Sequence, residues 1–498
     1  MCRQMAVCLA LGVGLWASIS YAAAPKAPEA EIRHEQEVLS VQFSPDGKWI
    51  ATAAGDALTL WDARNRQQQW SDRVGAPASM AWSPEGDRLA LASTDGVVRV
   101  WTAADMRQAP VQFRVQQGHL GGMSFSPDGK LLACGGAHLI VSLWDIEKQR
   151  EIKQFQRQSN WWVGSVGFVG DGRRLLAGGY DGFIRIWDIE SGKEVLKLAA
   201  PMFTQVAISP DGKTLVSNGD GQRLRVLEAA TGRVRQEFGQ HGAADFSPLF
   251  SPDGRVVAER AKQEQFLRLW DRTSGTALGE LEGGGPCAFS ADGGWVALGQ
   301  GGTLCLWRMR DLMPQRAPPP KREADQLESL WRDLGGTDAT KAYGAVLALA
   351  DAPEAPAFAR GHIRADRAEA PAGLDKLVAE LDDDDFQVRE KAQRQIIALG
   401  PVVEPILRRA LKDASAEVKL RLEQILAELA SAGPALAELQ ALRGIEALEL
   451  GGTEACAQAL LAISKADLPR TTQADAAAAA ARLARRFKLA RGATTKRG

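Results

Sequence analysis

The chain has few of the residues that build most catalytic sites. It contains five histidines and three tyrosines in 498 residues, and no two histidines have the HExxH or HxxxH spacing of a metal site. The GxSxG sequence of a hydrolase nucleophile is also absent. We therefore predict no catalytic residue, no metal and no cofactor, and expect the histidines to be hydrogen-bonded structural residues. They are His34, His119, His138, His241 and His362.

An excess of charge of either sign is lacking too. Lys and Arg number 60 and Asp and Glu number 61, so the formal net charge is −1. A protein dedicated to nucleic acid or to an anionic membrane surface usually carries a basic excess. We therefore expect no nucleic-acid partner.

Paired cysteines are missing as well. Cys2 and Cys8 lie in the N-terminal segment, and the other four cysteines include no CxxC pair, which excludes a disulfide framework or a zinc site. Cys287 and Cys305 fall on the first and third strands of one predicted sheet. Two strand steps of about 4.8 Å place them roughly 10 Å apart, too far for a disulfide. The remaining two are Cys134 and Cys456.

Long apolar runs are absent apart from one at the N-terminus. Arg3 precedes an uncharged stretch over residues 5–19, and Ser20 and Ala22 place small residues at the −3 and −1 positions of a cleavage site. The run is too short for a comfortable membrane span, so a cleaved signal peptide over residues 1–22 is favoured over an uncleaved anchor. The mature protein is then exported, as a periplasmic, envelope-associated or secreted protein with no membrane span.

Two other segments resemble a phosphate-binding loop and a calcium site, but neither meets the requirements of that site. SPDGKT at residues 209–214 lacks the first glycine of a phosphate-binding loop, because Ala207 stands in its place. Four consecutive aspartates, Asp382 to Asp385, cannot all point inward at a calcium ion. They are better explained as negative residues at a helix start.

The chain repeats one phrase seven times instead. A Ser-Pro-Asp-Gly turn flanked by alternating apolar residues predicts a β-hairpin, because Pro fixes the bend, Asp bonds its own backbone and Gly accepts a positive φ. The copies are VQFSPDGKWI from Val41, MAWSPEGDRL from Met80, MSFSPDGKLL from Met123, VGFVGDGRRL from Val166, VAISPDGKTL from Val206, PLFSPDGRVV from Pro248 and CAFSADGGWV from Cys287.

A third strand follows each hairpin and ends in Trp, or in Leu227 in the fifth copy. These positions recur about every 40 residues, the period of a propeller blade. A fourth strand follows most copies but not the seventh, and residues 29–36 are otherwise unused. We expect residues 29–36 to pair with the last blade and close the ring, which removes the open sheet edge. The Trp-place residues are 61, 101, 144, 187, 227, 270 and 307.

With these motifs the chain resembles the WD-repeat β-propeller family, of bacterial type, over about residues 29–310. SPDG recurs, Trp-Asp closes four blades, and the third begins with Gly118-His119. The resemblance implies a seven-bladed disc over residues 27–310 on which protein partners dock. The family's hydrogen-bonded His, Ser or Thr, Asp and Trp set is incomplete here, since its Asp survives only as Asp95 and Asp181. We therefore expect blades held mainly by apolar packing.

After a Pro-rich linker over residues 311–324 the pattern changes from strands to helices. Apolar residues recur at helical spacing, and Gly400 ends one predicted helix just before Pro401 begins the next. Residues 373–465 resemble bacterial HEAT-type helical repeats. The predicted fold is a multidomain chain: an all-β seven-bladed propeller, then an all-α, α-solenoid-like helical-repeat domain over residues 325–490 and a disordered tail over 491–498.

One local feature suggests a binding site. In SNWWVG, Trp161 and Trp162 stand at the entrance of a blade, and neighbours on a strand point opposite ways, so only one of them can be a core residue. The other is a candidate partner-binding residue, although both could pack between blades. The leading hypothesis is an exported non-enzymatic interaction scaffold. A periplasmic small-ligand or glycan binder, and less so a propeller hydrolase or quinoprotein, stay open.

Overall fold

The computed structural model describes residues 27–494 except 116–119, 137–139, 157–161, 202–203, 219–222, 240–245, 262–264, 314–320, 364–372, 400–402, 412–413, 432–435 and 467. The predicted signal peptide and Trp161 therefore lie outside the described residues. No helix in these ranges is long and apolar enough to cross a bilayer.

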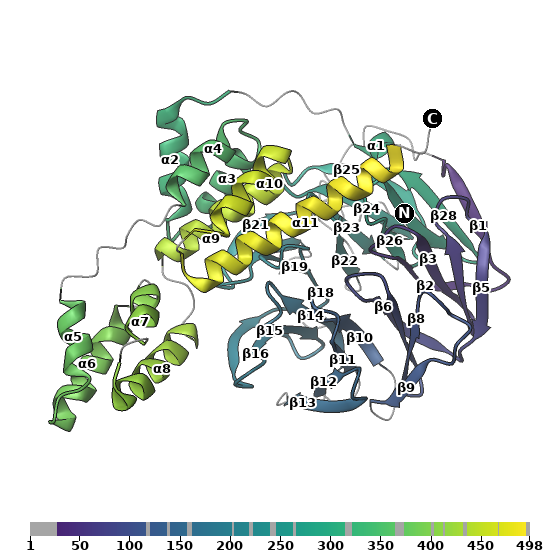
Figure 1. Ribbon diagram of the computed structural model, residues 1–498. Coiled ribbons are helices and arrows are strands. Elements are labelled where there is room, and N and C mark those ends of the chain that lie inside the picture. The colour runs from purple at the N-terminus through teal and green to yellow at the C-terminus, as the bar shows by residue number, and fades with distance from the viewer. Residues whose placement is uncertain are drawn as a thin grey trace, which may run out of the picture.

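The first part of the chain forms seven four-stranded antiparallel sheets arranged as a ring (Figure 1), which confirms the seven-bladed propeller. Blade one is β2 (Val38–Phe43), β3 (Trp49–Ala54), β4 (Ala57–Asp62) and β5 (Gln68–Arg73); blade two is β6 (Pro77–Trp82), β7 (Arg88–Ser93), β8 (Val97–Thr102) and β9 (Val111–Arg114); blade three is β10 (Leu120–Phe125), β11 (Leu131–Gly136), β12 (Ile140–Asp145) and β13 (Arg150–Gln156); blade four is β14 (Val163–Val169), β15 (Arg174–Gly179), β16 (Phe183–Asp188) and β17 (Glu194–Ala199).

The last three blades continue the same order. Blade five is β18 (Val206–Ile208), β19 (Thr214–Asn218), β20 (Leu224–Glu228) and β21 (Val234–Phe238); blade six is β22 (Phe246–Phe250), β23 (Val256–Ala261), β24 (Phe266–Asp271) and β25 (Ala277–Glu282); blade seven is β26 (Cys287–Phe289), β27 (Trp295–Gln300), β28 (Thr303–Arg308) and β1 (Ala30–Arg33). Cys287 and Cys305 are on the first and third strands of blade seven with β27 between them, as predicted, and both are free thiols.

The ring is closed by the N-terminal segment, as predicted. Strand β1 pairs antiparallel with β28, with Ala30 opposite Leu306, and supplies the outer strand that blade seven lacks. Ile32 of β1 is buried against the strands of blades seven and one. The propeller therefore depends on a strand that lies more than 250 residues away in sequence from its sheet partners.

Replacing Ile32 by alanine is expected to cost about 2–4 kcal/mol of unfolding free energy, because it leaves a cavity at the ring closure. Urea denaturation measures this. Glu31→Ala is the matched control, since the exposed Glu31 side chain lies on the same strand. An equal effect of the two substitutions would show that the closure does not rest on this packing.

Blade one keeps more of the family's hydrogen-bond set than we predicted. His34 Nε2 lies 2.9 Å from Thr52 Oγ1, and the Trp61 indole Nε1 donates to the same hydroxyl at 2.8 Å. His34 was not recognised from the sequence because Arg33, rather than glycine, precedes it. Apolar packing still dominates between blades, where the Trp-place residues Trp187, Leu227 and Trp270 are 3–4% exposed.

The Ser-Pro-Asp-Gly turns of neighbouring blades also contact one another, which is a second structural reason for this sequence to be repeated. A β-carbon at Gly172 would lie 2.7 Å from Pro127 Cδ in the preceding blade. In blade four, Gly170 replaces the proline and the next turn comes closer: a β-carbon at Gly212 would lie 2.1 Å from the Gly170 nitrogen. The contacts run in this way from blade one to blade six, whereas nothing lies within 4 Å of a β-carbon at Gly293 in blade seven.

The second part of the chain is helical, as predicted. The short helix α1 (Met309–Leu312) packs on blade seven. The others are α2 (Ala324–Leu334), α3 (Ala339–Ala350), α4 (Ala355–His362), α5 (Leu374–Glu380), α6 (Phe386–Ala398), α7 (Glu404–Ala410), α8 (Ala416–Ser431), α9 (Leu436–Gly451), α10 (Glu454–Ile463) and α11 (Arg470–Thr494).

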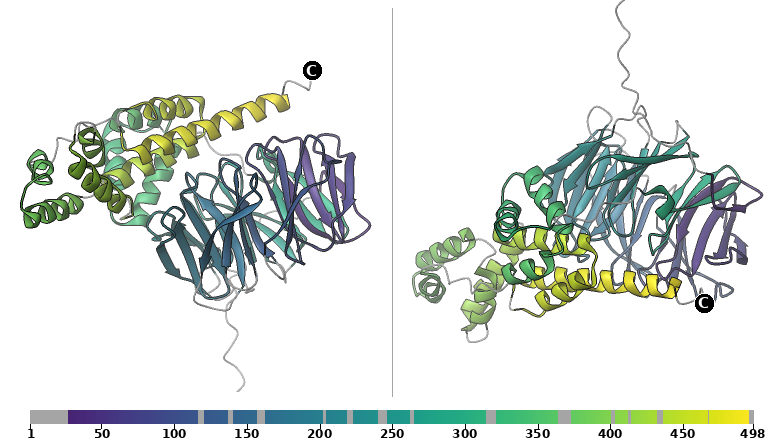
Figure 2. Two further views of the ribbon diagram at one scale, coloured as in Figure 1. Left: turned by 60° about the horizontal axis from the view of Figure 1, so that its bottom comes forward. Right: turned by 90° about the horizontal axis from the view of Figure 1, so that it is seen from above.

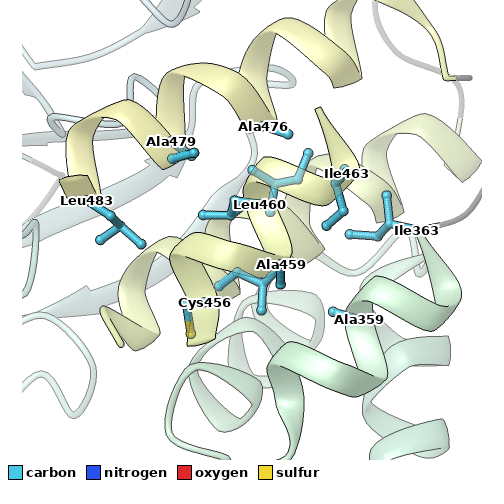
Figure 3. Packing of buried hydrophobic residues seen from close by; sticks show 12 residues of the cluster. Ala359, Ile363, Cys456, Ala459, Leu460, Ile463, Ala476, Ala479 and Leu483 are labelled. Atoms are coloured by element: carbon cyan, nitrogen blue, oxygen red, sulfur yellow. The ribbon is translucent and has the colours of Figure 1, made fainter. Parts of the chain in front are cut away.

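These helices form two groups with separate cores. One group consists of helices α2, α3, α4, α9, α10 and α11, whose cores join segments far apart in sequence. For example, Ala359 of α4 and Ile363 at the end of that helix pack in one core with Leu460 of α10 (Figure 3). Helices α5–α8 have their own core around Leu381, Ile396 and Leu422. They stand away from the disc in Figures 1 and 2, so the chain inserts a projecting four-helix arm between α4 and α9.

Candidate functional site

The candidate residue Trp162 lies directly before β14 and is half-buried. Its ring abuts blade three: a β-carbon at Gly121 would lie 2.6 Å from the indole Nε1. Its carbonyl accepts a hydrogen bond from the Tyr180 amide at 3.0 Å. These contacts show that part of Trp162 packs between blades, as our alternative interpretation held. A role in partner binding stays a prediction, and Trp161 lies outside the described residues.

The disc has two faces, which carry different connections between strands. The Ser-Pro-Asp-Gly turns and the connections from third to fourth strands lie on one face, which we call the turn face. Because the strands are antiparallel, the other connections, including the one that carries Trp162, lie on the opposite, loop face.

The helices contact the turn face at blades five and six. Arg255, in the blade-six turn, donates to the Leu450 carbonyl of α9 at 3.1 Å through Nε. Lys213, in the blade-five turn, forms an ion pair with Asp475 of α11 at 2.8 Å. Arg233 donates to the Thr337 carbonyl at 2.6 Å. These contacts leave the loop face clear of helices, as Figure 2 shows.

The centre of the contact is a row of alternating charges that we call the ionic ladder: Arg443, Glu228, Arg235, Glu446 and Arg272. Arg443 and Glu446 belong to α9, and the other three belong to the propeller. All five side chains are 0–2% exposed. Each rung therefore joins groups that water does not screen.

The distances are those of strong charge-assisted hydrogen bonds. Arg443 donates hydrogen bonds to both carboxylate oxygens of Glu228, from Nε at 2.8 Å and from Nη2 at 3.0 Å. Arg235 donates to Glu228 at 3.0 Å and to both oxygens of Glu446 at 2.7 and 2.9 Å. Arg272 Nη2 lies 3.7 Å from Glu446. Glu228 of the propeller is thus bound by one cation from each side of the boundary, whereas Glu446 of α9 is bound by two cations of the propeller.

Helix α11 extends the contact across the turn face. Arg482 grips Glu449 of α9 at 2.6 and 2.8 Å, and Arg486 donates to the Glu449 carbonyl at 3.1 Å. Farther along, Arg485 reaches Glu85 in the blade-two turn at 3.3 Å. Helix α11 therefore runs over the turn face from blade five toward blade two (Figure 2).

Sequence reasoning missed the ladder, although one signal was present. In four blades Trp is followed by Asp, and this Asp binds the next turn, as when Asp62 accepts from the Arg64 amide at 2.9 Å. In blade five the pair is Leu227-Glu228. The longer Glu228 still accepts from the Thr231 hydroxyl of its own turn at 2.7 Å, and it also reaches Arg443 in α9. The departure from the repeat therefore marks the docking surface.

The cations of this contact lower the pKa of two buried carboxylates, Glu228 and Asp211. Burial acts to raise the pKa of Glu228, but the Arg443 hydrogen bond and the Arg235 charge outweigh it and lower that pKa to about 2. Burial opposes ionisation of Asp211 too, yet the charges of Arg272 and Lys213 lower its pKa to about 2. Burial acts to lower the pKa of Arg235, but the charges of Glu446 and Glu228 outweigh it and raise that pKa. Perturbed titratable groups do converge here, but inside a sealed interface rather than in an open cleft.

This arrangement predicts an acid-sensitive contact. A carboxylate whose folded pKa is depressed stabilises the folded state above its ordinary pKa, near 4 to 4.5, and that stability is lost as pH falls toward 2. Hydrogen exchange of the α9 amides is expected to quicken between pH 4.5 and 2, relative to the central strands of blades one and two. An equal change in exchange rate in α9 and in the central strands of blades one and two would contradict this prediction.

No metal cluster was found among the described residues: no three His, Cys, Asp or Glu side chains gather there as ligands could. A shallow, open depression of about 440 Å³ lies on the arm, along the outer side of α6, with Gln387, Lys391 and Arg394 in its lining. It contains no convergent acid and base.

Comparison with known protein families agrees with the propeller. The family model described as "WD domain, G-beta repeat" matches residues 28–62 and 149–188, and "Anaphase-promoting complex subunit 4 WD40 domain" matches residues 80–162. Apart from β1, the matched residues lie in blades one to four, which are thus similar to WD40 repeats. Curated relatives align with the chain over short stretches only.

Protein HIR1 of Candida albicans is 31% identical over 90 residues, which cover 14% of this chain and 10% of the relative. Pre-mRNA-processing factor 19 homolog 2 of Arabidopsis thaliana is 32% identical over 74 residues, covering 15% and 14%. Small ribosomal subunit protein RACK1y of Oryza sativa is 30% identical over 71 residues, covering 12% and 21%. The chain thus spans about a tenth to a fifth of the length of these relatives, and they are eukaryotic, which does not support a bacterial type.

Proposed function

We propose that this protein is an exported, non-enzymatic scaffold for protein–protein interactions, whose WD40-like disc presents its loop face to a protein partner. The observation that carries the proposal is the occupied turn face: α9 and α11 cover the turns of blades five and six and extend to blade two. The loop face is left for docking. WD40 propellers typically serve in protein–protein interaction, which supports the same use here.

The partner's contact on this face includes Trp162, together with Trp161 as predicted from the sequence. Trp162 is half-buried, so one part of the ring is fixed by blade three while the rest meets solvent. A large, pre-oriented aromatic group is a typical hot spot of an interface. The near-neutral net charge of −1 favours a protein over a nucleic acid as the partner.

Export and the HEAT-type character of the helices remain part of the proposal on sequence grounds. The signal-like segment over residues 1–22 supports export to the periplasm, the envelope or the medium. The arm α5–α8 falls within the HEAT-like residues 373–465 and offers a second surface, with Phe386 and Leu420 more than half exposed.

Affinity capture from envelope extracts tests the proposal. The tagged mature protein is expected to retain a stoichiometric protein partner after crosslinking, and Trp162→Ala is expected to lose at least about nine-tenths of it, the loss that 1.4 kcal/mol produces. Ile152→Ala, on the outer strand β13 of blade three, is the control for removing an exposed apolar side chain. Capture unchanged by Trp162→Ala would remove Trp162 from the interface, and the absence of any partner would contradict the scaffold.

A further inference from the structure

No hydrophobic cluster joins the propeller to the helices among the described residues. Each cluster lies either within the propeller with α1 or within helices α2–α11. Helix α3 packs against β21, and the side-chain contacts that cross the boundary include the ionic ladder, the Lys213–Asp475 pair, hydrogen bonds to carbonyls, and the ring of Tyr343 beneath Arg235. Permanent interfaces are usually more apolar.

We propose that the ionic ladder is a docking latch, which releases the helices from the turn face without unfolding either part and so uncovers a second docking site. Buried ion pairs give little net stability, because the charges lose hydration on closing and regain it on opening. Opening here exposes no hydrophobic core, since each core belongs wholly to one side. The cost of opening is therefore set mainly by the polar contacts across the boundary, of which the ladder is the most buried group.

The closed state also leaves buried polar groups without hydrogen bonds. Nε, Nη1 and Nη2 of Arg272 have no hydrogen-bond partner, although the side chain is fully buried. The Tyr343 hydroxyl, on the helical side, lacks one too. An unsatisfied buried donor is costly, and opening would hydrate both groups. The unpaired polar groups of Arg272 and Tyr343 thus favour release of the helices, whereas the ion pairs of Glu446 favour docking.

Release would uncover four cations on the turn face of blades five and six: Lys213, Arg235, Arg255 and Arg272. In the closed state they face Glu446, Asp475 and the Leu450 carbonyl. The occupant that fits this surface is an acidic helical segment of a partner protein, presenting a carboxylate where α9 presents Glu446. This reading of the partner rests on the proposed scaffold function, whereas the latch itself does not.

Distance measurement between two spin labels tests the latch in the full chain. Glu147→Cys on the propeller and Leu461→Cys on α10 are both exposed sites. The otherwise wild-type protein is expected to give one short distance, and Glu446→Gln is expected to add a longer one while the propeller keeps its melting temperature. Glu423→Gln, which removes an exposed charge from the arm, is expected to change neither.

A single short distance in Glu446→Gln, or loss of both parts in one unfolding transition, would overturn the latch. Should Glu446→Gln not fold, Arg235→Lys replaces it, because Lys keeps the charge but loses the forked donors that hold Glu446. The spin-label distance and the melting temperature of the propeller then test the latch in the same way.

A synthetic peptide of residues 436–451 probes the partner chemistry separately. It is expected to bind the Glu446→Gln protein at least tenfold more tightly than wild type, and the peptide carrying Gln in place of Glu446 is expected to lose that binding. Equal binding of the two peptides would overturn the acidic occupant. The distance experiment needs no partner, so failure of the scaffold function and failure of the latch remain distinguishable.

Discussion

Gly212→Ala is expected to destabilise the propeller by about 2–5 kcal/mol, more than an alanine in the same turn of blade seven. About 1–2 kcal/mol comes from the left-handed backbone at φ +72°. A further cost of about 1–3 kcal/mol comes from moving the blade-four turn, since the new β-carbon would lie 2.1 Å from the Gly170 nitrogen. Backbone cannot move aside as a flexible side chain can.

Gly293→Ala is the matched control. Its φ is +69°, but nothing lies within 4 Å of the added β-carbon, so only the backbone strain of about 1–2 kcal/mol is expected. Urea unfolding of the two variants measures the difference directly. Equal losses would show that the turns of neighbouring blades do not support one another.

Arg235→Ala is expected to speed hydrogen exchange of the α9 amides by about 100-fold. The substitution leaves Glu228 and Glu446 buried without the cation they share, and removing one partner of a buried ion pair costs about 3–5 kcal/mol. Since 1.4 kcal/mol is a factor of ten, a loss of about 3 kcal/mol in local opening free energy gives roughly that acceleration. Exchange followed by mass spectrometry resolves the α9 peptides.

Arg223→Ala controls for the loss of an arginine from the same blade, because Arg223 is exposed and lies outside the ladder. The central strands of blades one and two should exchange as in wild type in both variants. Unchanged α9 exchange in Arg235→Ala would mean that the ladder does not hold the helices on the disc.

The propeller could be predicted because its information is local and repeated. Turn chemistry, apolar alternation and a period near 40 residues each specify a hairpin or a blade without long-range knowledge. The closing strand followed by elimination: residues 29–36 were unused and blade seven lacked an outer strand, and β1 indeed pairs with β28.

The docking surface could not be predicted in the same way. Glu228 meets Arg443 across 215 positions of sequence, and Arg235 meets Glu446 across 211. Periodicity shows only that Arg443 and Glu446 share one side of a helix, not what covers it. The substitution of Trp-Asp by Leu227-Glu228 was the one local trace of the contact.

The helical region shows the same limit. Apolar spacing identified its helices. The packing of α3 with α9 and of α4 with α10 could not be predicted, because the chain first runs through the arm α5–α8 and then returns to the earlier helices. Nothing in local spacing distinguishes that path from neighbours stacked in order.

The central claim is that the loop face receives the partner because the helices occupy the turn face. Photo-crosslinking from four sites tests it most directly: the exposed Thr94 and the half-buried Trp162 on the loop face, and the exposed Asn65 and Lys130 on the turn face. We predict crosslinks to the captured partner from the first two sites and none from the last two. Crosslinks from Asn65 and Lys130 alone would contradict the account.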